Sequence, residues 1–181
     1  ISESSTINVV LVSDLKAKEL DIDLGGPESV HLIDELKRLE HEGYHFEAAD
    51  ASLELLMRRA AGWEQSWFRV ESMRVITDEL PNGDFSTEAT VKVWVGDERH
   101  VRTAEGNGPV NAIDTALRAA LQEALPVLGR IHLTDFKVRI LDGATATGAV
   151  TRVLLDATNG ERTWTTIGVS SNIIEASWRA L

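Results

Sequence analysis

An internal repeat is the feature of this sequence that most restricts its fold. Asn111–Ala119 (NAIDTALRA) recurs as Asn172–Ala180 (NIIEASWRA), 61 residues further on, with asparagine, isoleucine, an acid, arginine and alanine in the same order. Two upstream pairs follow at similar spacings: Ala89–Val95 with Ala149–Leu155, and Val70–Val75 with Leu133–Val138. A repeat of this length is a supersecondary unit. Two such units usually pack about a pseudo-twofold axis, and clefts at such axes often hold small ligands.

Composition excludes several classes of partner. The 181 residues carry a net charge of −11, which argues against nucleic acid or an anionic membrane as a partner. No apolar run is long enough to span a membrane. Cysteine is absent, so we expect no disulfide framework or cysteine-based zinc site, and a reducing cytoplasm as the default location. Residues 1–6 contain neither an initiator Met nor a signal peptide, and we therefore expect a piece of a longer protein.

Hydrophobic periodicity predicts a helical part followed by two similar strand-rich parts. Apolar spacings of three and four predict two helices within about 27–61, ended by Gly43 and Gly62, in a helical linker subdomain over 1–63. From 64 to 181 the pattern reads β-β-β-α twice, in units of about 67–126 and 130–181. The expected strands are 68–76, 87–95, 100–104, 131–141, 148–156 and 163–168, and the expected helices 109–125 and 171–181. The sequence therefore predicts an α+β fold.

One short motif resembles a zinc site. His41-Glu42-Gly43-Tyr44-His45 fits the pattern H-E-x-x-H, which binds metal only on a continuous helix. Gly43 lies where the first helix should end, so we expect the two histidines not to share a face. We find no third ligand and no catalytic constellation, and predict no metal in this chain.

Two loops and two element ends are candidate binding or capping sites. Gly106-Asn107-Gly108-Pro109 precedes a predicted helix, where free N–H groups attract carboxylates; a tight turn capped by Gly108 or Asn111 is the alternative. Residues 142–148 form a loop of small residues that could fold over a ligand or be a plain hairpin loop. Asn172 and Glu175 fit a helix-capping pattern. Phe136, Val138 and Ile140 are expected to be core residues or a pocket wall.

Several segments together resemble a known enzyme family. Residues 43–56 (GYHFEAADASLELL) are similar to the GYxFExAxASxELL segment of citramalate synthases. Four further segments resemble the LeuA dimer-type regulatory domain that these enzymes share with 2-isopropylmalate synthases: STEATVKV, AEGNGPVNA, DFKVRILDG and WTTIGVSSNIIEASW, beginning at residues 86, 104, 135 and 164.

The resemblance implies a regulatory role. The family condenses an acyl-CoA with a 2-keto acid, acetyl-CoA and pyruvate in the case of citramalate synthase. Its catalytic residues and divalent metal belong to a TIM barrel that these 181 residues do not include, so this chain should be inactive and hold no cofactor of its own. The C-terminal domain forms a homodimer and binds the end-product amino acid, which implies isoleucine or leucine as the small-molecule effector.

The resemblance also assigns effector-binding residues to this chain. They are Gly106, Asn107, Gly108, Val110 and Asn111 before and in one helix; Leu133, Phe136, Ile140 and Val150 as the pocket wall; Asp142, Gly143, Ala144, Thr145 and Ala146 in the small-residue loop (142–147); and Ser170, Ser171 and Asn172 at the last helix. Helix-start N–H groups would bind the carboxylate, and Asn111, Asp142 or a backbone carbonyl the ammonium group. Because one methylene changes affinity by only about 1–3 kcal/mol, isoleucine and leucine both remain open.

Four readings remain open at the level of sequence. The parent is either a citramalate synthase inhibited by isoleucine or a 2-isopropylmalate synthase inhibited by leucine. The chain could instead be a structural dimerisation module without a ligand, or a metalloenzyme that uses His41 and His45. One departure from the family is that Ser4–Asn8 (SSTIN) lacks the Gly and Arg of the S-G-R-x-N segment, which puts linker coupling in question.

Overall fold

A computed structural model of the chain describes residues 16–20, 22, 25–141 and 148–181. Its contacts divide it into two compact units. One unit joins the helical region up to Glu64 with Leu133–Ala157 and Thr163–Ala180 of the second repeat, and the other holds Gln65–His132, Thr158–Arg162 and Leu181. The helical region therefore shares a unit with the second repeat.

The helical region consists of α2 (Gly26–Glu42), the short 3₁₀ helix η1 (Phe46–Ala48) and α3 (Asp50–Ala60). Pro27 lies in the first turn of α2, where its missing N–H costs no hydrogen bond. Gly43 follows with φ 109°, a left-handed conformation that glycine adopts without strain, and its N–H bonds back to Glu40. The predicted helix end at Gly43 is confirmed, while the second predicted helix is split into η1 and α3.

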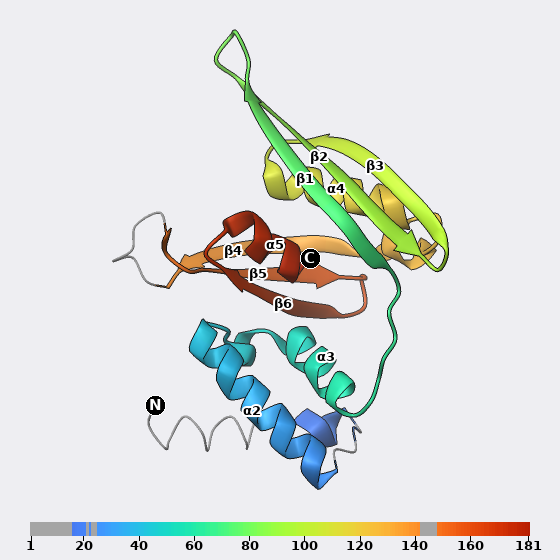
Figure 1. The fold of residues 1–181 in the computed structure, drawn as a ribbon, viewed down its shortest axis with the longest axis vertical. Helices are drawn as coiled ribbons and strands as arrows, with labels where there is room; N and C mark the ends of the chain where they lie inside the picture. The colour runs from blue at the N-terminus through green and yellow to red at the C-terminus, as the bar shows by residue number, and fades with distance from the viewer. Residues whose placement is uncertain (1–15, 21, 23–24, 142–147) are drawn as a thin grey trace. The chain divides into compact units, whose positions relative to one another are not determined.

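The first repeat is an antiparallel sheet with one helix. Strands β1 (Arg69–Glu79), β2 (Phe85–Val95) and β3 (Glu98–Gly106) pair in the order β1-β2-β3, and α4 (Pro109–Leu121) packs on β2 and β3. Ala89, Val91 and Val93 of β2 are fully buried, as is Ile113 of α4. Figure 1 shows α4 against this sheet and the β1–β2 hairpin extending beyond β3. Alternating apolar residues on β2 thus meet the apolar stripe of α4.

The second repeat has the same order of elements. After the 3₁₀ helix η2 (Pro126–Arg130), strands β4 (His132–Ile140), β5 (Thr151–Thr158) and β6 (Thr163–Ser170) form a sheet ordered β4-β5-β6, followed by α5 (Ile173–Ala180). An acid–arginine pair lies at the same place on each repeat's helix: Asp114–Arg118 at 2.8 Å and Glu175–Arg179 at 2.6 Å. The predicted α+β fold with two β-β-β-α units is confirmed.

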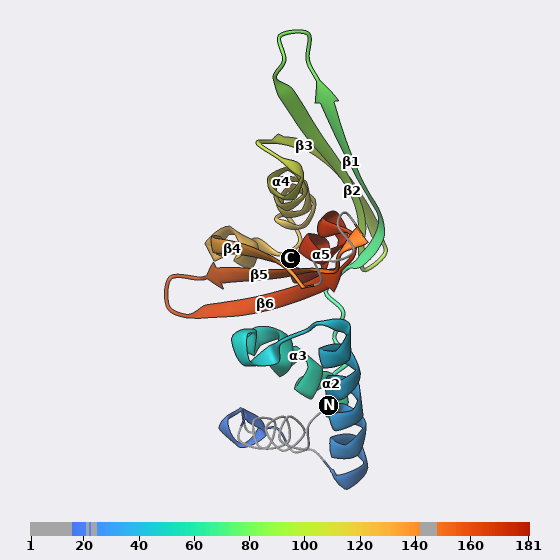
Figure 2. The same ribbon diagram turned by 90° about the vertical axis from the view of Figure 1, so that its left-hand side faces the viewer.

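Helices pack on both faces of the second sheet. In Figure 2, α5 lies on one side of β5 and β6 and α3 on the other. The core against α3 contains Leu36, Leu53 and Met57 of the helices and Ile167 and Val169 of β6, all at most 3% exposed. The described residues contain no helix long and apolar enough to cross a membrane.

Side chains of α3 also occupy the free edge of β6. The N–H of Thr165 donates to the Asp50 carboxylate at 2.8 Å, and the N–H of Ile167 donates to the Ser52 hydroxyl at 3.0 Å. Residues two apart on a strand present their N–H groups to the same side. Here that side faces the start of α3 and not β5. The start of α3 therefore completes the hydrogen bonding of this edge.

Candidate functional site

The first group of expected site residues forms the turn from β3 into α4. Gly106 leaves no space for a side chain, because a Cβ there would lie 2.4 Å from the backbone nitrogen of Ala112. Gly108 is the N-cap of α4 with extended backbone (φ 171°, ψ 173°), and no atom of the described residues lies within 4 Å of the position its Cβ would take. The Asn111 side-chain oxygen accepts a hydrogen bond from the N–H of Asn107 at 3.2 Å. The turn is tight, and the surroundings of Gly108 are open.

The cap of α4 is unlike the cap of α5. No side chain caps α4 at Gly108. At α5, the Asn172 side-chain oxygen accepts hydrogen bonds from the N–H groups of Ile174 and Glu175, at 2.9 and 3.4 Å. The expected capping role of Asn172 is confirmed, whereas its counterpart Asn111 turns back to Asn107. Since first-turn N–H groups attract anions, the side-chain-free start of α4 is the better carboxylate site of the two.

Ser170 and Glu175 strengthen the cap of α5. The Ser170 hydroxyl accepts from the N–H of Asn172 at 3.0 Å and donates to Glu175 at 2.7 Å. That hydrogen bond, followed by the charge of Arg179, lowers the pKa of Glu175. Ser171 is exposed beside them. Ser170 and Asn172 are thus engaged in the helix start itself.

The expected wall residues lie on two faces of the second sheet. Phe136, Val138 and Ile140 share one face of β4 and are 41%, 41% and 62% exposed, so the expectation that they are core residues is wrong. Leu133, an odd number of residues from all three, points to the other face and is 37% exposed. Val150 packs against the core formed with α2 and α3. Phe136 and Ile140 therefore share one surface, which Leu133 and Val150 do not join.

The small-residue loop lies outside the described residues. Asp142, Gly143, Ala144, Thr145 and Ala146 all belong to 142–147, and their assignment stays a prediction. Its neighbours are described: the N–H of Leu141 donates to the carbonyl of Val150 at 2.9 Å, which closes the β4–β5 pairing beside the loop.

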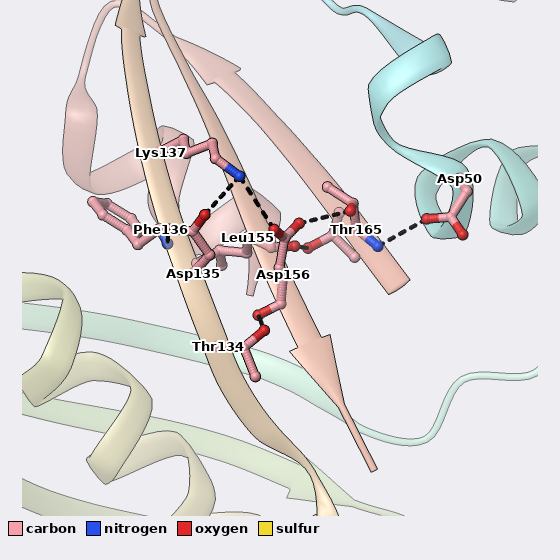
Figure 3. A network of polar contacts seen from close by, with 9 residues as sticks. Asp50, Thr134, Asp135, Phe136, Lys137, Leu155, Asp156 and Thr165 are labelled. Carbon is pink, nitrogen blue, oxygen red and sulfur yellow. Dashed lines mark hydrogen bonds and ion pairs between the residues drawn. The ribbon is translucent and has the colours of Figure 1, made fainter. Parts of the chain in front are cut away.

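A polar network on the α3-facing side of the second sheet could not be read from local spacing. The Lys137 ammonium lies 2.6 Å from the Asp135 carboxylate and 3.3 Å from that of Asp156 (Figure 3). The Lys137 contact lowers the pKa of Asp135, and the two carboxylates raise the pKa of Lys137. Asp156 also accepts from the Thr165 hydroxyl at 2.6 Å, so the network spans β4, β5 and β6.

The geometry of the His41–His45 motif does not match a zinc site. The helix ends at Glu42 and Gly43 reverses the chain, so His45 lies outside the helix that carries His41. Among the described residues, no group of three or more His, Asp or Glu side chains is placed to hold a metal ion.

Comparison with known proteins decides the family. The model of the LeuA allosteric (dimerisation) domain matches residues 47–181. The chain belongs to this family. Its relatives include (R)-citramalate synthases of Streptomyces coelicolor, Aquifex aeolicus and Synechocystis, which are 50%, 48% and 46% identical over 93%, 94% and 100% of this chain. A 2-isopropylmalate synthase of Shewanella sp. (strain ANA-3) is 28% identical over 91% of it.

The LeuA-type chain spans about a third of the length of these citramalate synthases, 32–34% of each. The family match begins in η1 and includes α3 as well as both repeats. The family's domain as matched here therefore includes part of the region that the sequence alone assigned to a linker.

Proposed function

We propose that this chain is the C-terminal regulatory region of a citramalate synthase-like enzyme and binds isoleucine as a feedback inhibitor. The observation that carries the proposal is the difference in similarity, 36–50% identity to five citramalate synthases against 28–31% to three 2-isopropylmalate synthases. The parent would join acetyl-CoA to pyruvate outside these 181 residues. Isoleucine lies downstream of that reaction, which makes it the fitting inhibitor.

The start of α4 supports an amino-acid carboxylate. Its N-cap is a glycine without a capping side chain, and the Cβ direction of Gly108 is open. N–H groups of the first turn carry a partial positive charge, and together with the helix dipole they favour an anion. In this proposal the carboxylate binds at Gly108–Asn111.

The second repeat supports the other effector contacts. Phe136 and Ile140, with Val138 between them, offer an exposed apolar stripe for a branched side chain. Leu133, Val150 and the 142–147 loop are proposed contacts by family resemblance, as are Ser170, Ser171 and Asn172. Because Ser170 and Asn172 already cap α5, we assign them to shaping the site rather than to binding a carboxylate.

A homodimer is part of the proposal, since the family's domain is a dimerisation domain. Sedimentation of the chain should give twice the monomer mass of 19.9 kDa. A monomer at micromolar concentration would contradict it.

Calorimetric titration with isoleucine, leucine and valine tests the proposed effector. We expect isoleucine to bind more tightly than leucine, by a factor of roughly 5 to 150, because shape differences of one methyl position are worth about 1–3 kcal/mol. Preference for leucine would instead assign the parent to the 2-isopropylmalate synthase reaction. No heat with any of the three, from a folded dimer, would contradict effector binding and favour a structural module.

A further inference from the structure

The end of α2 is packed tightly against the second repeat. A Cβ on Gly43 would lie 2.4 Å from the Leu141 side chain, 3.5 Å from that of Val169 and 3.8 Å from that of Val150. Glycine is favoured there because φ is 109°, and a side chain would also require the end of the Leu141 side chain to shift. The contact joins residues about 100 positions apart in sequence.

Arg152 of β5 holds this junction by a hydrogen bond. Its Nε donates to the carbonyl of Gly43 at 2.6 Å. The last carbonyls of a helix carry a partial negative charge, which a cation at this place complements. Burial, and then the charge of Arg139 on the same face, lower the pKa of Arg152, so the guanidinium gives up solvation to make this bond. Removing it leaves a carbonyl at a packed junction without this donor.

The residues against Gly43 adjoin the proposed effector residues. Leu141 directly precedes Asp142, and Val169 directly precedes Ser170. Val150 is itself a proposed contact, and its carbonyl accepts from the N–H of Leu141 at 2.9 Å. A ligand that shifts Val150 or Ser170 would change the packing against Gly43.

We propose that the Gly43–Arg152 contact is a positioning element of the effector site and couples that site to the end of α2. The inference rests on the proposed function. Effector binding fixes Leu141 and Val169, which tightens the packing on Gly43. By linkage, an intact junction in turn favours effector binding. The second repeat is thus the part of the regulatory region through which the effector acts on the helices.

Arg152→Met tests the coupling, because methionine is about as long as the aliphatic part of arginine but has no N–H group to donate to the Gly43 carbonyl. Hydrogen exchange should accelerate at least tenfold at the amides of 39–44 and Leu141. Isoleucine affinity, measured by calorimetry, should fall at least fivefold. Arg152→Lys, which retains a cationic donor, should recover most of both.

The matched control is Lys92→Met, since the repeat places Lys92 60 residues before Arg152. In the first repeat this ammonium contributes to the charge around Glu71. We expect Lys92→Met to leave both measurements unchanged. If Arg152→Met does not fold, hydrogen exchange of the wild-type chain with and without isoleucine replaces it. Isoleucine should then slow exchange at the amides of 39–44, and unchanged exchange there would overturn the inference.

The outcomes separate the inference from the proposed function. Faster exchange with unchanged isoleucine affinity would make Arg152 merely structural and overturn the inference, as would unchanged exchange. Wild-type chain that binds no isoleucine would contradict the proposed function. The exchange at Leu141 in Arg152→Met would then test only the structural contact. Acceleration would show that Arg152 holds Gly43 without supporting the coupling, and no change would overturn both.

Discussion

Gly108→Asp should weaken effector binding while slightly raising the stability of the fold, so the two effects can be told apart. Backbone at φ 171° is accessible to any residue, and within the described part of the chain no atom lies within 4 Å of the new Cβ. Aspartate is a better N-cap than glycine by a few tenths of a kcal/mol. A negative charge at a helix start adds about 0.3–1 kcal/mol. We therefore expect the variant to fold and to be slightly more stable than the wild type.

The same carboxylate should strongly disfavour the effector's own carboxylate. Two unit charges about 4 Å apart repel by about 4 kcal/mol at an effective dielectric constant of about 20. Salt screening at this open site reduces the repulsion, so we expect a loss of binding free energy of about 2–4 kcal/mol. Since about 1.4 kcal/mol is a factor of ten, isoleucine binding should weaken roughly 30- to 1,000-fold.

Calorimetry and urea unfolding of the same samples measure both effects. Gly108→Asn is the matched control, because it adds a capping side chain of the same shape without the charge. An asparagine cap would occupy the same first-turn N–H groups, so we expect it to weaken isoleucine binding as well. The loss should be clearly smaller than in Gly108→Asp, since no new like-charge pair forms. Wild-type affinity in a folded Gly108→Asp variant would refute the placement of the carboxylate at the start of α4.

Two further predictions concern stability. Gly168→Ala places a Cβ 1.9 Å from the backbone oxygen of Ala176, and should lower the free energy of unfolding by about 1–3 kcal/mol in urea titrations. Gly148→Ala, with no atom of the described residues within 4 Å of its Cβ, is the control, and equal losses in both would contradict the packing argument. Hydrogen bonds from Arg99, and then from Trp94, lower the pKa of Glu71 to about 2. Its ionised form therefore stabilises the fold above its ordinary pKa of 4.5, and this contribution is lost as the pH falls toward 2. The stability of Glu71→Gln should change less than that of the wild type across this interval, and parallel pH profiles would argue against the pairing.

Local patterns predicted the elements that depend on local rules. The end of α2 followed from Gly43, and the cap of α5 from Asn172 and Glu175, because capping is decided within a few residues of sequence. The repeat predicted the order of strands and helices, since each copy had to form the same supersecondary unit.

Contacts between distant segments could not be predicted in this way. A period of two identified β4 as a strand, but it does not say whether Phe136 and Ile140 have anything packed over them, and they are exposed. The spacing likewise gives no sign that Arg152 reaches a carbonyl 109 residues earlier. In the candidate site, the sequence predicted that a helix starts at each of the two asparagines. It did not predict that Asn172 caps its helix while Asn111 accepts a hydrogen bond from the N–H of Asn107.

The acceptors at the start of α3 bear on the solubility of the second repeat. A strand edge with free N–H groups can pair with a strand of another molecule and so begin aggregation. Asp50 and Ser52 take up two of these groups on β6, while the apolar residues of α3 cover Ile167 and Val169. A protein shortened to begin after α3 would lose both kinds of shielding at once. The helices that precede the two repeats thus protect one edge and one face of the second sheet from association with the sheet of another molecule.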